Sequence, residues 1–220
     1  MESKLNTNQV YSLLKEKMAS LEFKPGQSLS EKDITLSFKV SRTPVRHAFA
    51  KLERDGLIEI IPRKGAFIKV LSMKAILEIF QVRKALEGLA AQLAAKNVDL
   101  EALKEFENFY SNALRGGCSD NLQEIFNFGI KFHDFIINSG DNQIVERILK
   151  DLQVQLGISR IFFLNHNSNA QLFRSAETIK EHLRIIEALK RGDGELAEAR
   201  MKEHIANAEK YVFSFHEIHS

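Results

Sequence analysis

Three histidines have the residue type and the spacing to form a metal site: His133, His182 and His204. His182 lies ten residues before Gly192, and His204 lies ten residues after Gly194. If both flanking segments are helices folded as an antiparallel hairpin, their equal rise brings the two imidazoles to the same height. His133 lies beside apolar residues, on the inward side of another expected helix. Neutral imidazoles are the usual ligands of zinc and related divalent ions, so the pattern favours a site, although any one of these histidines alone suits an ordinary helix position.

A second set of residues, Arg42, Thr43 and Arg46, has the chemistry for reading duplex DNA. Ser41 is a good helix N-cap and Pro44 is tolerated in a first turn, so a helix is expected to begin here. Its two arginines lie about one turn apart near the tip. Guanidinium groups in that position can bind guanine edges in the major groove. Taken alone, the segment is equally consistent with a surface helix that carries two solvated arginines.

The composition is typical of a globular protein. The chain has 220 residues, of which 44% are hydrophobic and 27% are charged, enough for one large or two modest domains. Its single cysteine, Cys118, excludes an intramolecular disulfide. We see no export signal and no run of 18 apolar residues, so we expect a cytoplasmic protein with no membrane partner.

The net charge of +2 conceals an asymmetry along the chain. Residues 1–71 contain 13 Lys and Arg against 8 Asp and Glu, whereas residues 72–220 contain 18 against 21. All three prolines also lie in the first part. We therefore predict two domains, a small basic one over 1–71 that binds a polyanion and a larger helical one over 72–220.

Three helices are expected in the first domain. Apolar residues at helical spacing predict an amphipathic helix over residues 8–21, which ends before a Lys-Pro-Gly turn. Ser28 or Ser30 can cap a short second helix, and a third runs from residue 42 to about residue 55. The buried stripe of this third helix is predicted to be Val45, Phe49 and Leu52. The side chains that it leaves exposed are Arg42, Thr43, Arg46 and His47.

Two strands follow these helices. Residues 57–61 and 66–70 have the composition of strands, and a Pro-Arg-Lys-Gly turn over 62–65 joins them. Three helices and a hairpin with a basic tip predict a winged helix-turn-helix.

Helical periodicity continues through the second domain. Breaks rich in Gly, Asn, Asp and Ser divide it into six expected helices, roughly 72–96, 99–115, 120–138, 141–164, 171–191 and 194–217. The predicted fold is therefore mainly α, with a winged helix-turn-helix followed by a six-helix all-α bundle.

Four motifs of the first domain resemble, in order and spacing, the DNA-binding domain of GntR-family transcription regulators. They are PGQSLSE from residue 25, VSRTPVR from residue 40, LERDGLI from residue 52 and RKGAF from residue 63. The resemblance implies six DNA contacts: Arg42, Thr43 and Arg46 in the major groove, Lys32 from the second helix, and Lys64 and Gly65 in the minor groove. His47 stands where the family usually carries Glu. This loss of a negative charge should strengthen non-specific DNA binding.

Residues 72–210 resemble the all-helical effector-binding domain of the FadR subfamily of these regulators. The motifs are RKALE from residue 83, FH from residue 132, EHLRII from residue 181 and MKEHI from residue 201. In metal-binding members, an Asp four residues before the first His completes a set with three His. This chain has Gly129 there, so the anionic ligand is missing. Asp134 cannot replace it, because it lies about 100° around the helix from His133.

Two alternatives remain open for this domain. In the first, the three histidines hold zinc or nickel, and the uncancelled charge favours a small organic acid as effector. In the second, the site contains no metal and the histidines bind the carboxylate directly. Arg83 and Arg160, each in an otherwise apolar stretch, are candidates to bind that carboxylate, but a snorkelling arginine or a structural ion pair would explain either residue equally well.

The resemblance implies an effector-responsive transcription regulator, most often a repressor. It would act as a homodimer on a pseudo-palindromic operator, since one winged helix reads only a few base pairs and two-fold pairing doubles the contacts. The rival functions are a helical metal-dependent enzyme that uses the three histidines and a sequence-indifferent DNA-packaging protein. The enzyme is disfavoured because we find no carboxylate at a spacing that suits a general base, and because the basic domain would have no task.

Overall fold

The computed structural model describes residues 5–19, 22–116, 122–152 and 168–219. Two of the residues discussed above, Cys118 and Arg160, lie outside these ranges. The described chain forms two compact units, one that ends at Ala75 and another that contains Ile76–Lys150 and residues 168–219. Within the described ranges, every helix is too short or too polar to cross a membrane.

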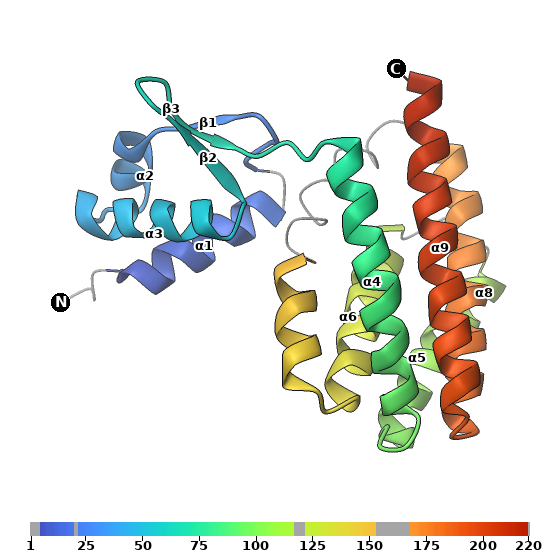
Figure 1. The fold of residues 1–220 in the computed structure, drawn as a ribbon. Helices are drawn as coiled ribbons and strands as arrows, with labels where there is room; N and C mark the ends of the chain where they lie inside the picture. The colour runs from blue at the N-terminus through green and yellow to red at the C-terminus, as the bar shows by residue number, and fades with distance from the viewer. Residues whose placement is uncertain (1–4, 20–21, 117–121, 153–167, 220) are drawn as a thin grey trace. The chain divides into compact units, whose positions relative to one another are not determined.

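The first unit combines three helices with a small antiparallel sheet (Figure 1). Its elements are α1 (Thr7–Ala19), β1 (Ser28–Leu29), α2 (Glu31–Ser37), α3 (Arg42–Arg54), β2 (Ile58–Ile61) and β3 (Gly65–Ile68). The strand order is β1-β3-β2, with Leu29 opposite Ala66 and Ile60 opposite Ala66 on the other side. This is the predicted winged helix-turn-helix, and the structure adds the short strand β1.

One apolar core holds the first unit together. The predicted stripe of α3 is buried, with Val45 and Leu52 at 0% exposure and Phe49 at 2%. It packs with buried residues of every other element of the unit, namely Val10, Leu14, Met18, Leu29, Ile34, Leu57, Ile58, Ala66 and Ile68. Since the inward face of α3 is fixed by this core, its polar face is held outward.

The N-cap predictions for α2 and α3 have different outcomes. Ser30 caps α2, and its hydroxyl accepts a hydrogen bond from the backbone N–H of Asp33. Ser41 occupies the N-cap position of α3, but its side chain makes no capping hydrogen bond. The position was predicted correctly, whereas the stabilising contact is present only at Ser30.

The second unit is an all-α bundle, which confirms the predicted fold class (Figure 1). Its labelled helices are α4 (Met73–Ala94), α5 (Leu100–Arg115), α6 (Leu122–Ser139), α8 (Ser168–Lys190) and α9 (Gly194–His219). Residues 143–152 form a further helix, which agrees with the start of the predicted segment 141–164. Helix α8 begins three residues earlier than predicted, and α9 continues two residues further.

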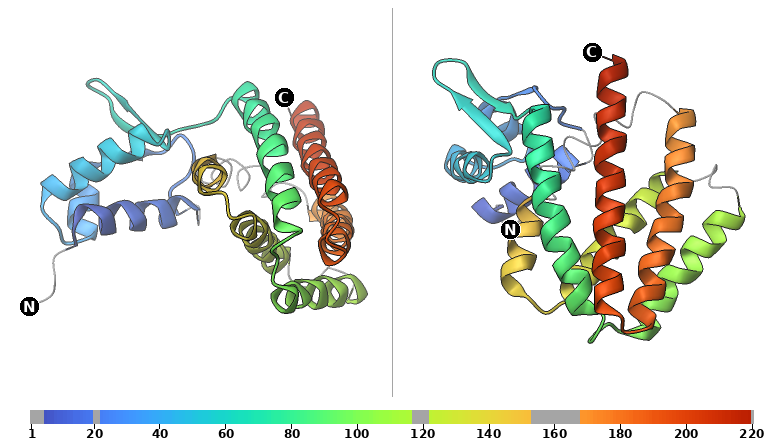
Figure 2. Two further views of the ribbon diagram at one scale, coloured as in Figure 1. Left: turned by 60° about the horizontal axis from the view of Figure 1, so that its bottom comes forward. Right: turned by 45° about the vertical axis from the view of Figure 1, so that its right-hand side comes forward.

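A sharp turn joins α8 to α9 as an antiparallel pair, which Figure 2 shows running side by side. Gly192 has φ +65°, the backbone N–H of Asp193 donates to Ala188, and the N–H of Gly192 donates to Leu189. These bonds form a Schellman motif, which favours glycine at its left-handed position. The side chain of Asp193 then caps α9 by accepting from the N–H of Leu196. The hairpin assumed for the histidine spacing is therefore present.

Candidate nucleic-acid interface and candidate metal centre

The outward face of α3 presents the predicted reading residues. Arg42, Thr43 and Arg46 are exposed, and the Arg46 side chain is 72% exposed. Its Nε lies 4.0 Å from a carboxylate oxygen of Glu31, the limit of an ion pair between exposed groups. His47 is exposed on the same helix. Among the described residues of the first unit, the contact with Glu31 is the one ion pair of Arg46, so its guanidinium can reach a ligand.

Two further predicted contacts lie on neighbouring elements of the same unit. Lys32 is exposed in the first turn of α2, which packs against α3. Lys64 and Gly65 are exposed at the turn between β2 and β3. Arg63 and Gly65 have φ of +65° and +105°, so this turn is tightly wound. The structure thus places all six predicted DNA contacts on exposed positions of one unit.

Helix α3 has few charges that would repel a phosphate. Among its residues, Glu53 is the one acid, and its carboxylate accepts a hydrogen bond from the backbone N–H of Ile60 on β2. Arg54, which the sequence analysis did not select, adds an exposed cation in the last turn. The exposed charge of the helix is therefore predominantly positive, which suits a polyanion.

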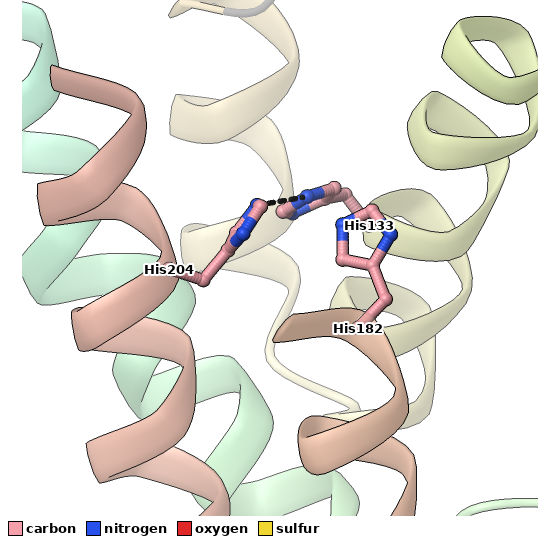
Figure 3. A group of neighbouring side chains, drawn as sticks. All are labelled: His133, His182 and His204. Carbon is pink, nitrogen blue, oxygen red and sulfur yellow. Dashed lines mark hydrogen bonds between the residues drawn. The ribbon is translucent and has the colours of Figure 1, made fainter. Parts of the chain in front are cut away.

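The three histidines of the second unit meet in its interior (Figure 3). His133 comes from α6, His182 from α8 and His204 from α9, and they are 8%, 2% and 5% exposed. One ring nitrogen from each lies within 4.8 Å of the others. The ring centroids of His182 and His204 are 4.7 Å apart, as the matched spacing from the turn predicted. The cluster proposed from the sequence is present.

The ring nitrogens that face one another have the separation of ligands to one cation. Nε2 of His133 lies 3.2 Å from Nε2 of His204. Two nitrogens bound to one tetrahedral zinc at about 2.1 Å lie roughly 3.4 Å apart. An ion between these two nitrogens would need little movement of either ring. His182 of α8 would be the third ligand. Three imidazoles with this arrangement fit zinc or a related divalent ion.

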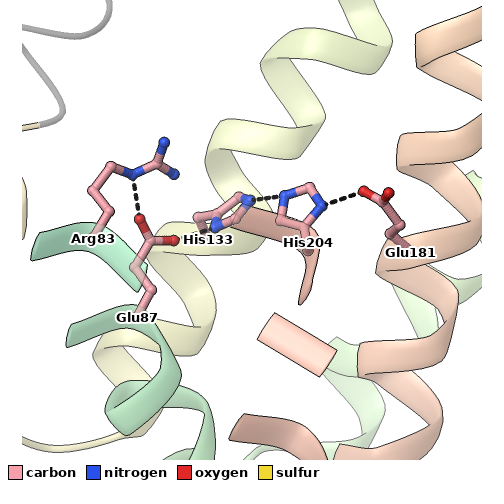
Figure 4. Close-up of polar contacts among 5 residues, drawn as sticks. All are labelled: Arg83, Glu87, His133, Glu181 and His204. Carbon is pink, nitrogen blue, oxygen red and sulfur yellow. Dashed lines mark hydrogen bonds and ion pairs between the residues drawn. The ribbon is translucent and has the colours of Figure 1, made fainter. Parts of the chain in front are cut away.

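Two buried glutamates that the sequence analysis missed hold the outer sides of these rings (Figure 4). Glu87 of α4 lies 2.5 Å from Nδ1 of His133, and Glu181 of α8 lies 2.7 Å from Nδ1 of His204. Asn207 donates a hydrogen bond to the other oxygen of Glu181 at 2.9 Å. Burial alone would raise the pKa of Glu87, but its ion pair with Arg83 and its contact with His133 hold that pKa well below its ordinary value. Glu87 is therefore a carboxylate.

Arg83 lies in the same network, as Figure 4 shows. It is 2% exposed, and its Nε donates to Glu87 at 2.5 Å. Its Nη1 has no hydrogen-bond partner among the described residues. A buried guanidinium N–H without an acceptor is costly, so an anion at this point would be favoured. Arg160, the other predicted effector contact, lies outside the described residues.

Gly129 lies one helical turn before His133 and faces His182. A Cβ built at Gly129 would lie 3.5 Å from Cε1 of His182, an ordinary contact distance. The ligand side of the site therefore has no carboxylate at this position. We expected the ligands to leave the charge of a bound ion uncompensated, and the three histidines by themselves carry no negative charge. However, Glu87 lies directly behind His133 and Glu181 directly behind His204, and both can offset that charge.

Aromatic side chains close the site around His182. The rings of Tyr110 and Phe132, both 0% exposed, lie 4.9 Å from its ring. Burial raises the pKa of the Tyr110 hydroxyl, which therefore stays neutral. These contacts surround the imidazole with aromatic rings, and the low local dielectric strengthens the attraction between a bound cation and the nearby carboxylates.

Comparisons with known proteins match each of the two units to a known domain family. Residues 6–68 match bacterial regulatory proteins of the gntR family, and residues 78–207 match the FCD domain. The chain is 33% identical over 200 residues to the uncharacterized HTH-type transcriptional regulator YdhC of Bacillus subtilis, which covers 89% of this chain and 86% of that protein. It is 28% identical over 204 residues to the HTH-type transcriptional repressor RspR of Escherichia coli, and this match covers 93% of this chain and 87% of that protein. The solved structure of E. coli McbR/YncC superposes over both whole chains with a TM-score of 0.79 at 22% identity, a likeness of fold.

Proposed function

Because this chain belongs to the gntR family of bacterial regulatory proteins and carries an FCD domain, we propose that it is a repressor released from its operator by a small organic acid. The members of its family and its relatives are transcription regulators and not enzymes. This chain is likewise a DNA-binding transcription regulator and not an enzyme. RspR, one of these relatives, is named as a repressor, and that sign of regulation is the one we propose here. The protein would act in the cytoplasm, where its DNA is.

The observation that carries the DNA-binding half is the outward face of α3. Arg42, Thr43 and Arg46 are exposed near the start of a helix whose other face is buried in the core. A recognition helix reads base edges from this position, and Arg forms bidentate bonds with guanine. We propose that Lys32 contacts the backbone from α2, and that Lys64 and Gly65 of the wing enter the minor groove. Two copies would read the two halves of a pseudo-palindrome as a homodimer.

The effector half of the proposal rests on the three buried histidines. His133, His182 and His204 would hold zinc or nickel through ring nitrogens, since their donor atoms lie within 4.8 Å of one another. The bound ion would supply a positive centre that attracts a carboxylate. Arg83 would bind the same anion, because its Nη1 has no other acceptor among the described residues. We keep Arg160 as a further candidate contact.

Effector binding would act on DNA affinity through the arrangement of the two DNA-binding heads. An effector can shift this equilibrium only if it binds the released state more tightly than the DNA-bound state. We propose that the segment near residues 71–72, between the domains proposed as 1–71 and 72–220, transmits this preference. Thermodynamic linkage then requires that operator DNA weaken effector binding by the same factor.

The DNA half is tested by selecting binding sites from a random duplex library with the full-length protein. We expect a pseudo-palindromic consensus that binds much more tightly than a scrambled duplex of equal length at physiological salt. Equal affinity for both duplexes at every salt concentration would contradict the proposal and identify a sequence-indifferent DNA-binding protein.

The effector half is tested with the selected duplex and a panel of small carboxylic acids, using zinc-loaded and chelator-treated protein. Release of DNA by an acid only in the loaded form supports the metal-centred site. Equal release in both forms would replace it with the metal-free alternative, in which the histidines bind the carboxylate directly.

A further inference from the structure

Glu87 and Glu181 are buried acids that the proposed function does not use. They are 0% and 7% exposed, and each lies on the side of a histidine ring away from the cluster. The described residues that can ligate a metal together are the three histidines alone, so neither glutamate belongs to the ligand set. Burying a carboxylate is costly unless it is paired and hydrogen bonded. The contacts of these two acids therefore call for an explanation.

Each carboxylate fixes the orientation of one imidazole. An ionised carboxylate can only accept hydrogen bonds, so the Nδ1 atom that contacts it carries the hydrogen. In a neutral ring of that tautomer, Nε2 has a lone pair and no hydrogen. The Nε2 atoms of His133 and His204 then face one another at 3.2 Å, a separation that suits a proton or a metal ion shared between them. The two glutamates thus prepare both rings to ligate a positive ion.

The same carboxylates supply negative charge that the ligands do not carry. Three neutral imidazoles offer no charge to a divalent ion, and Gly129 places no side chain on this face of α6. Arg83 offsets the charge of Glu87, since its Nε donates to that carboxylate at 2.5 Å. Glu181 accepts a hydrogen bond from the amide of Asn207. Both carboxylates lie directly behind a ligand ring, where they offset part of the charge of a bound ion.

We propose that Glu87 and Glu181 are the outer-shell carboxylates of the three-histidine site, where they orient His133 and His204 and supply its negative charge. This proposal rests on the metal site proposed above and assigns roles to two residues outside the ligand set. Outer-shell partners of this kind typically contribute about 10- to 100-fold to metal affinity. They act as positioning residues and do not touch the ion.

Zinc affinity of the full-length protein, measured by competition with a chromogenic chelator, tests the proposal. Glu181→Gln keeps an acceptor for Nδ1 but removes the charge, whereas Glu181→Ala removes both. We expect Glu181→Gln to bind zinc about 10-fold more weakly and Glu181→Ala about 100-fold more weakly. Glu177→Gln, one turn earlier on α8, is the matched control, because Glu177 pairs with exposed Lys180 at the surface and the substitution should leave the affinity unchanged.

Glu87→Gln provides a second test on another helix, with thermal unfolding of the metal-free variants as the check on folding. Long-range ¹H–¹⁵N spectra of the metal-free wild type should show His133 and His204 with hydrogen on Nδ1. Zinc binding by the wild type together with unchanged affinity in Glu181→Ala would overturn this proposal alone. A wild type that binds no zinc or nickel would overturn the metal site and this proposal with it.

Discussion

Nε2 of His133 lies 3.2 Å from Nε2 of His204, although 71 residues separate the two along the chain. The opposite nitrogen of each ring contacts a buried carboxylate, so neither ring is free to rotate. This meeting is imposed by the packing of α4, α6, α8 and α9 and is not a chance contact of mobile side chains. A pair of imidazoles fixed in this way is suited to hold a cation.

The protein purified without chelator should therefore contain about one zinc or nickel ion per chain, measured by elemental analysis. The double variant His182→Ala, His204→Ala removes two of three ligands and should contain none. We expect it to keep operator binding, because its substitutions lie in the second unit, but to lose release by effector. His47→Ala is the matched control, since this exposed histidine lies in the first unit and should leave the metal content unchanged.

A double variant that keeps its metal would show that the ion binds elsewhere. Loss of operator binding with intact effector binding would show that the two histidines support the fold and not the response.

Arg46→Ala should weaken binding to the selected operator by about 1–3 kcal/mol, the range of a bidentate contact with guanine. The fold should be unaffected because the Arg46 side chain is 72% exposed. Fluorescence anisotropy measures the affinity for the operator duplex and the affinity for the scrambled duplex. Arg191→Ala removes an exposed arginine from the second unit and should change neither. An unchanged footprint for Arg46→Ala would remove this residue from the reading surface.

Periodicity predicted the helices that carry both sites, because the residues that favour a helix locally are also the ones that pack into the core. The buried stripe of α3 and the matched heights of His182 and His204 follow from helical geometry alone. Strand β1 was missed, since two residues carry no alternation that could mark a strand. It forms through pairing with β3, which sequence reasoning cannot see.

The two outer glutamates were missed for a related reason. Glu87 is 46 residues from His133, and Glu181 is 23 residues from His204, so no local spacing joins either pair. In the sequence, Glu87 suggests only an ion pair with Arg83 four residues earlier. Glu181 adjoins His182 but contacts the histidine of the neighbouring helix. Their roles depend on which helices pack together.

Tyr11→Phe should destabilise the first unit by about 1 kcal/mol at pH 7, because it removes a hydrogen bond to Asp55 and keeps the ring. Burial and Asp55 raise the pKa of Tyr11 above its ordinary value of 10.0. Above pH 10 the unfolded chain loses this proton while the folded chain keeps it, so the wild type loses stability as the pH rises. The variant lacks this titration, and the difference between the two proteins should shrink.

Hydrogen exchange of first-unit peptides at several pH values measures the difference. Tyr211→Phe, in the second unit, is the control. A difference between Tyr11→Phe and wild type that grows above pH 10 would contradict the assignment.

Tyr110→Phe should have the opposite effect to Tyr11→Phe. The Tyr110 hydroxyl is buried and has no hydrogen-bond partner among the described residues. An unsatisfied buried hydroxyl costs about 1–3 kcal/mol, so its removal should be neutral or stabilising. Chemical denaturation of metal-free protein measures this. A loss of more than about 1 kcal/mol, the usual net worth of a hydrogen bond, would show that the hydroxyl has a partner such as ordered water.

Ser30→Ala and Ser41→Ala separate a capping contact from a capping position. Ser30 accepts a hydrogen bond from the N–H of Asp33, so its loss should cost about 1 kcal/mol. Ser41 occupies the N-cap of α3 without such a bond, so Ser41→Ala should cost less than about half as much. Hydrogen exchange of the first turns of α2 and α3 measures each cost locally. Equal costs at both sites would mean that Ser41 caps its helix in solution, and α3 would then begin as firmly as α2 does.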